Sequence, residues 1–151
     1  MIRFQFSLRR VLDFRRLRAD LARAALDRLH LERQQLLARE QALLESREQE
    51  EQAVREPGVS LTVTRLDALD QLQHYVTGAR KRFAQQHTEL AARMHEQEAA
   101  VMQADREVGL LEKLESRQRA GWQLKFDKEL EELAADSYMS RFHRQARSGD
   151  G

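Results

Sequence analysis

Cysteine is absent from this 151-residue chain, which also contains one proline, six glycines and only nine aromatic residues. Without cysteine, neither a disulfide framework nor a thiolate zinc site can form. So few turn-forming residues argue against a sandwich, a barrel or any fold built from many short elements. The mean hydropathy is −0.73 and no apolar run approaches the length of a membrane span, so we expect no direct membrane insertion.

Good helix formers dominate what remains: Leu, Ala, Arg, Glu and Gln. The only strong break lies at residues 56–60, where Pro57-Gly58 suits a type II turn. Beyond it, Thr64 with Asp67 resembles a helix N-cap. We therefore predict a single all-α domain over 1–151. Its parts are a helix at about 7–55, a turn at about 56–63, a helix at about 64–144 and a disordered tail at 147–151.

Both expected helices carry apolar residues at heptad spacing, which is typical of a coiled coil. Because one tight turn joins them, they should fold back on each other as a long antiparallel hairpin, with the second helix overhanging the first. The register that fits best pairs Leu36 with Phe83, Leu29 with Leu90, and Leu12 with Val108. The predicted core comprises Leu8, Leu12, Leu26, Leu29, Leu36, Leu43, Val54, Leu66, Val76, Phe83, Leu90, Met94, Val101, Val108 and Leu111.

The same register sets polar residues opposite one another. It places Arg47 opposite Gln73 and Arg33 opposite His87. It also places Glu40 opposite Arg80, which suggests a polar layer that fixes the register at some cost in stability. The alternative is that Glu40 and Arg80 simply point into solvent.

Most of the aromatic residues fall near the open end of the expected hairpin, around the two segments 4–14 and 122–142. Exposed apolar patches usually mark binding surfaces, so this tip is a candidate binding site. Its candidate contact residues are Phe6, Arg9, Arg10, Phe14, Arg16, Trp122, Phe126, Leu130 and Leu133. Two alternatives stay open: Phe4 and Phe6 could fold over Trp122 and close the end, or the overhang could pair in a homodimer.

No pattern in the chain indicates catalysis. There is no glycine-rich phosphate loop and no His-Glu-x-x-His motif, and a two-helix hairpin offers no pocket that would shift a carboxylate pKa. We expect no enzyme activity, no cofactor and no metal. Aspartates interleave with the arginines of the first 31 residues, so we expect no nucleic-acid partner either.

Three stretches together resemble the flagellar export protein FliJ family. They are residues 4–15 (FQFSLRRVLDFR), the segment LQHYV at 72–76 with FAQQ at 83–86, and the C-terminal pair LLEKLE at 110–115 and ELEELA at 129–134. The similarity spans nearly the whole chain. Two departures are a small Ala79 one turn after Tyr75, where the family more often has a larger apolar residue, and Glu131-Glu132 in place of Asp-Glu.

The resemblance implies a cytoplasmic, non-enzymatic stalk or adaptor of the flagellar type III export apparatus, peripheral to the inner membrane and needed for motility. Such a protein binds the hexameric export ATPase through its open end and escorts empty export chaperones. It also contacts the cytoplasmic domain of the membrane export gate, here through Tyr75, Ala79 and Phe83. The alternatives are a homodimeric coiled-coil spacer and a holdase-type chaperone for secreted subunits.

Overall fold

The computed structural model describes residues 2–56, 58 and 62–149. The chain is an all-α hairpin of two long helices, α1 (Arg9–Arg55) and α2 (Val63–Ser148). The predicted boundaries agree with these to within a few residues. The largest difference is at the C-terminus, where Arg147 and Ser148 belong to α2 instead of a disordered tail.

Between the helices the structure describes Gly58 and the residues from Thr62 onward. Gly58 has a φ of 97°, a left-handed conformation that glycine adopts without steric cost. The rest of the predicted type II turn lies outside the described residues. The N-cap of α2 is Thr62 and not Thr64, because the Thr62 Oγ1 accepts a hydrogen bond from the backbone N–H of Arg65 at 3.3 Å. Both threonines carry the same capping hydroxyl, so the sequence alone does not separate them.

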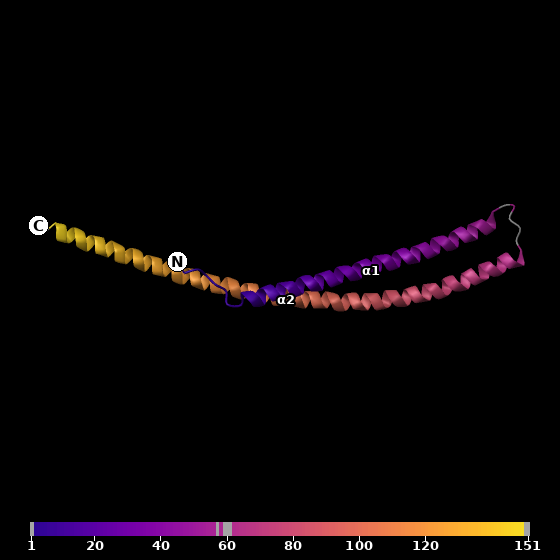
Figure 1. The fold of residues 1–151 in the computed structure, drawn as a ribbon, viewed down its shortest axis with the longest axis horizontal. Coiled ribbons are helices and arrows are strands. Elements are labelled where there is room, and N and C mark those ends of the chain that lie inside the picture. Colours follow the sequence, from indigo (N-terminus) through magenta and orange to yellow (C-terminus); the bar gives the residue numbers. More distant parts are fainter. Residues whose placement is uncertain (1, 57, 59–61, 150–151) are drawn as a thin grey trace. The chain divides into compact units, whose positions relative to one another are not determined.

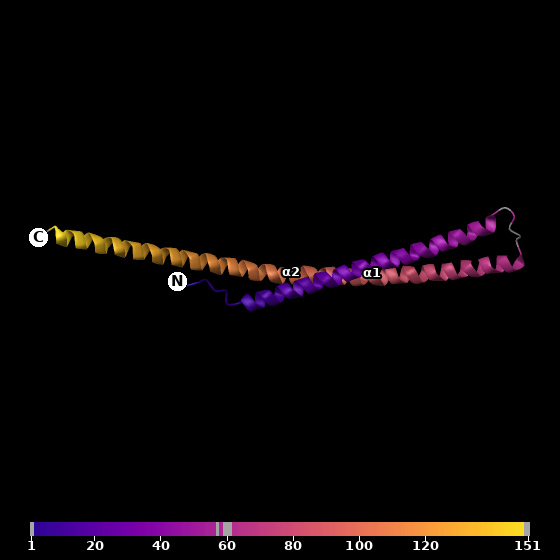
Figure 2. The ribbon, with the colours of Figure 1, turned by 45° about the horizontal axis from the view of Figure 1, so that its top comes forward.

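The contacts divide the hairpin into two units, whereas the sequence suggests one body. Unit 1 comprises residues 1–17 and 105–151, and unit 2 comprises residues 18–104. In unit 2 the two helices run side by side and antiparallel (Figure 1 and Figure 2). Arg47 donates to Gln73 near the turn, at 3.2 Å, and Gln97 donates to the carbonyl of Ala22 at the other end, at 2.9 Å.

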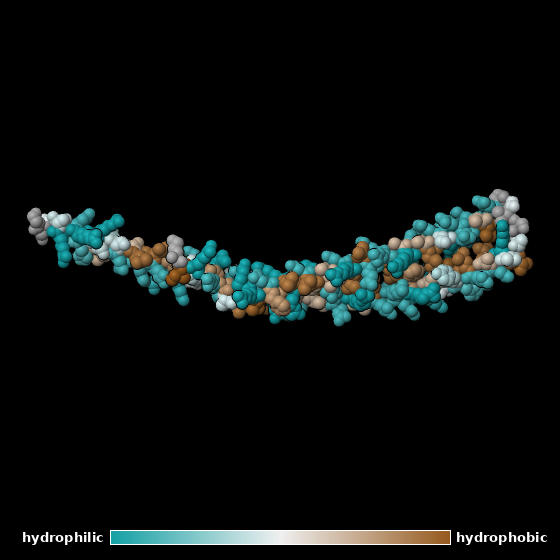
Figure 3. Space-filling model, viewed as in Figure 1, coloured by the Kyte–Doolittle hydropathy of each residue, from teal (hydrophilic) through white to brown (hydrophobic). Residues whose placement is uncertain are grey.

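The core of unit 2 is a cluster of Leu36, Leu90 and Met94, with Leu29 and Phe83 packed against it. This cluster brings together the residues of two predicted layers. Hydrophobic side chains line the seam between the helices, and hydrophilic ones cover much of the outer surface in view (Figure 3).

Burial of the predicted core is graded. Buried members are Leu12, Leu36, Val76, Leu90 and Met94, of which Leu12 and Val76 are fully buried. Half-buried members are Leu8, Leu26, Leu29, Leu43, Val54, Phe83, Val101, Val108 and Leu111. Leu66 is the exception, because 52% of it is exposed. Leu66 lies in the first turn of α2, and half-burial begins only at Leu69. A hairpin of two helices covers each side chain from one direction, which explains why most of the seam remains partly open.

The partner predicted for Glu40, Arg80, is wrong. Glu40 Oε2 lies 3.0 Å from Nε2 of His87, about two helical turns along α2 from Arg80. Arg80 and Arg33 are both exposed. The physical reason is desolvation: an exposed guanidinium keeps its water, whereas the smaller imidazole reaches the carboxylate from a half-buried position.

Candidate binding surface at the open end of the hairpin

The N-terminal segment before α1 lies along α2 beyond the start of α1 and places the Phe4 ring against it (Figure 1 and Figure 2). The ring centroids of Phe4 and Trp122 are 6.0 Å apart, and Trp122 stacks on Phe126 at 5.1 Å with an interplanar angle of 11°. The guanidinium of Arg119 lies 5.1 Å from the Phe4 ring centroid, in cation–π geometry. The end of the hairpin is therefore closed by its own aromatic residues, one of the alternatives left open by the sequence.

This closure changes the role of two predicted contact residues. Phe6 is buried, with 8% exposed, so it is a structural residue and not an exposed contact. Trp122 is half-buried between Phe4 and Phe126. Packing against its own chain removes part of an aromatic ring from water, which favours the closed arrangement. Phe14 remains 55% exposed.

Three arginines of α1 meet three glutamates of α2 beside this aromatic group. Arg9 pairs with Glu115 at 3.0 Å and Arg15 with Glu107 at 2.7 Å. Arg16 pairs with Glu112 at 3.1 Å. The sequence indicates Arg9 and Arg16 as contact residues, whereas in the structure both have acidic partners on α2. These pairs could have been predicted from the register, because it sets the positively charged start of α1 opposite the segment of α2 that carries the three glutamates.

The pairing reduces the positive charge that this end offers to a partner. Arg9 and Arg16 are each also within 4.0 Å of Asp13. Arg10 is exposed. Of the three arginines predicted as contact residues, two therefore pair within the hairpin itself, which reduces the long-range attraction that this end exerts on an acidic partner.

Beyond Phe126, every described residue of α2 is exposed. This segment includes Leu130, of which 48% is exposed, and Leu133, of which 63% is exposed. Tyr138, Met139 and Phe142 are also more than half exposed. A single amphipathic helix gains little stability in water, so an apolar surface of this extent indicates a place for another helix or protein. We name residues 127–148 the C-terminal arm.

The structure separates the three residues of the expected gate surface. Tyr75 is 60% exposed, and the guanidinium of Arg82 lies 6.0 Å from its ring centroid. Phe83 is half-buried and packs against the core cluster of unit 2. Ala79 is buried, with 4% exposed, so the prediction that it belongs to a contact surface is wrong. Its small side chain follows Val76 by one turn and lies in the seam.

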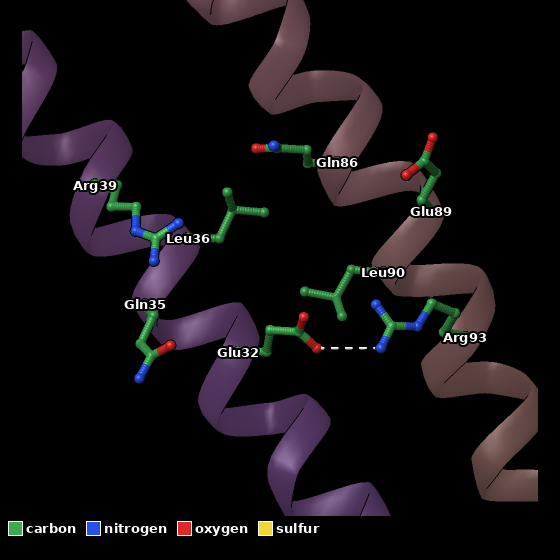
Figure 4. Close-up of a pocket in the computed structure, with 8 residues that line it drawn as sticks. All are labelled: Glu32, Gln35, Leu36, Arg39, Gln86, Glu89, Leu90 and Arg93. Atoms are coloured by element: carbon green, nitrogen blue, oxygen red, sulfur yellow. Dashed lines mark hydrogen bonds and ion pairs between the residues drawn. The ribbon is translucent and has the colours of Figure 1, made fainter.

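A groove lies between the helices of unit 2 beside the core (Figure 4). Leu36 and Leu90 point into it, and Glu32 and Arg93 close one side with a 3.3 Å ion pair. Of its remaining polar residues, Gln35 and Glu89 point away from Leu36 and Leu90, whereas Gln86 extends from α2 toward α1. Within the described ranges, no three His, Asp or Glu side chains gather closely enough to hold a metal ion. In the same ranges, neither helix contains a stretch apolar enough to cross a membrane.

Comparison of the chain with known protein families, with curated proteins and with solved structures gives no match. The function must therefore be argued from the residues and the geometry. The features that carry most information are the self-closed aromatic group and the exposed C-terminal arm that follows it.

Proposed function

We propose that this protein is a non-enzymatic adaptor of a flagellar type III export apparatus, with the C-terminal arm as its contact to the hexameric export ATPase. The observation that carries the proposal is the exposure of the arm, with Leu130 and Leu133 on a helix that no other described segment covers. Its sequence, ELEELA at 129–134, is also part of the resemblance to the FliJ family.

The arm has the shape and the apolar surface that binding inside a ring of subunits requires. A long helix with exposed leucines offers apolar area to the inner surface of a ring, and a narrow two-helix stem next to it provides support. Arg10 adds positive charge near the start of α1. Complementary charge raises the association rate more than the affinity. The exposed leucines should therefore determine how tightly the arm binds.

The proposal includes two further contacts. The exposed Tyr75 would contribute to binding of the cytoplasmic domain of the export gate, since aromatic residues are frequent at interface hot spots. Empty export chaperones would bind elsewhere on the rod. With these contacts, the proposed location is the cytoplasm, peripheral to the inner membrane at the flagellar base.

The test compares two leucine substitutions on the same helix. Leu133 and Leu124 are both exposed, at 63% and 72%, and two and a half turns separate them, so they face opposite sides of α2. We expect Leu133→Ser to weaken binding of the export ATPase and to reduce stimulation of its ATP hydrolysis. Leu124→Ser should leave both unchanged.

A truncation after Ser116 gives a second, larger test. It removes the arm and Trp122 but leaves unit 2 intact, so unit 2 should stay helical while ATPase stimulation is lost. Full stimulation by a folded truncation, or equal effects of the two leucine substitutions, would contradict the proposal.

A further inference from the structure

The C-terminal arm continues a row of apolar residues that recur at every fourth position. The row consists of Trp122, Phe126, Leu130, Ala134, Tyr138 and Phe142. Because an α-helix has 3.6 residues per turn, side chains spaced by four form a ridge that is inclined to the helix axis. A heptad seam, with its mean spacing of 3.5, would instead run nearly parallel to the axis.

The first part of this ridge is already covered within the chain. Phe4 packs on Trp122, and Trp122 stacks on Phe126. From Leu130 onward the ridge is exposed, with 69% of Tyr138 and 58% of Phe142 accessible. The exposed part of the row therefore continues an apolar surface whose first part is already covered by Phe4. No described residue covers the part from Leu130 onward.

The spacing defines the shape of that partner. Two such helices can pack at the small crossing angle of about 20°, at which the middle of each row and the residues one heptad away from it face the partner. The distance between such helices depends on the side chains at the crossing point. Ala134, the smallest member, lies near the middle of the row, between Leu130 and Tyr138. The ridge is thus suited to crossing a similar helix at Ala134.

The charges along the arm change sign near its middle. The part before Ser137 is acidic, with Asp127, Glu129, Glu131, Glu132 and Asp136 against Lys128. The part after Ser137 carries Arg141, Arg144 and Arg147, with no acidic residue among the described positions up to 149. Two copies of this helix attract each other when antiparallel and repel each other when parallel.

We propose that the C-terminal arm binds the arm of a second copy of this chain, as an antiparallel crossed pair with its two-fold axis at Ala134. The axis places Leu130 against Tyr138 of the second copy and Phe126 against its Phe142. Asp127 then meets Arg141, and both lie within about 20° of Ala134 around the helix. The pairing is isologous, so each contact occurs twice.

This inference stands independently of the adaptor role. The surface is small for a protein interface, so the dimer should be weak, with dissociation in the micromolar range. Because the dimer covers Leu130, it excludes any other partner from the same ridge while it persists.

A cysteine-free chain allows a direct test with the full-length protein. Ala134→Cys should form a disulfide-linked dimer under mild oxidation, because the two thiols face each other across the axis within the short reach of a disulfide. Ala135→Cys is the matched control: the same substitution at an exposed position about 100° around the helix. Equal cross-linking of the two variants, or none in Ala134→Cys, would overturn the proposal.

Charge reversal tests the orientation by sedimentation equilibrium. Asp127→Arg and Arg141→Asp should each raise the dissociation constant about fivefold, since each puts like charges opposite one another. The double variant restores opposite charges and should return the constant to that of the parent chain. Additive weakening in the double variant, or a parent chain that stays monomeric at the highest accessible concentration, would refute the antiparallel pair.

Discussion

Around Leu90 and around Trp122, α2 meets its neighbours in different ways. At Leu90 another regular helix supplies leucine side chains, and the resulting cluster excludes water from three residues. At Trp122 the neighbour is the irregular segment before α1, and the contact consists of half-buried rings beside exposed ion pairs. Apolar burial stabilises the first region, whereas around Trp122 Phe6 is buried but most of the other contacts remain shared with water.

This difference has a consequence for function. Exposed ion pairs contribute little to stability, and a half-buried aromatic group can open without unfolding the rest. The hairpin can therefore keep its core while its open end rearranges to receive a partner.

The largest expected effect is at the core of unit 2. Leu90 is 4% exposed, and Leu90→Ala removes a buried side chain from the cluster with Leu36 and Met94. We expect a loss of about 2–3 kcal/mol in the free energy of unfolding, the low end for such a change, because the seam is partly wet. Thermal melting by circular dichroism measures it, and an unchanged melting temperature would show that this cluster does not stabilise the hairpin.

A smaller effect is expected at the aromatic closure. Trp122→Ala should cost about 1 kcal/mol, since the rings it contacts are only half-buried. The change should be local: hydrogen exchange should accelerate at Arg9 and Leu12, whose N–H groups donate to the carbonyls of Phe6 and Leu8, and stay the same around Leu90. Acceleration throughout unit 2 would show that the two regions unfold together.

A still smaller effect is expected from the ion pairs. Arg15 and Glu107 are 2.7 Å apart, and about a third of each side chain is exposed. A double-mutant cycle with Arg15→Ala and Glu107→Ala should give a coupling energy of about 0.2–1 kcal/mol, smaller at high salt. A salt-independent coupling larger than this range would mean that the pair is shielded from water.

The smallest expected effect on stability is at Tyr75. Its ring is exposed, so Tyr75→Ala should change the free energy of unfolding by less than about 0.5 kcal/mol. Binding to the cytoplasmic domain of the export gate should weaken, whereas Phe83→Ala should destabilise the hairpin as well. A strong fall in the melting temperature of Tyr75→Ala would show that the residue supports the fold.

Sequence periodicity predicted the hairpin and most of its core because long helices have one dominant signal. Helix propensity predicts where α1 ends. Heptad spacing predicts the burial of Leu36 and Leu90 and the contact between Arg47 and Gln73. The pairing of Glu40 does not, because the reach and hydration of individual side chains decide whether Arg80 or His87 is its partner.

The open end was less predictable for a related reason. Composition shows that aromatic residues gather there, but whether Phe6 is exposed or folded back depends on an irregular segment that has no periodicity. The four-residue row from Trp122 to Phe142 is visible in the sequence, yet a search in heptads passes over it. Ala79 illustrates the same limit, since its burial beside Val76 lies outside the assigned heptad positions.

The most direct test of the account is hydrogen exchange of the full chain at two protein concentrations. The account predicts slow exchange around residues 83–97 at both concentrations, because that protection comes from the hairpin itself. Residues 126–142 should exchange fast in dilute protein and become protected in concentrated protein, as arms pair. If residues 126–142 show the same protection at both concentrations, or if they are as protected as residues 83–97 in dilute protein, the arm is not an open surface awaiting a partner.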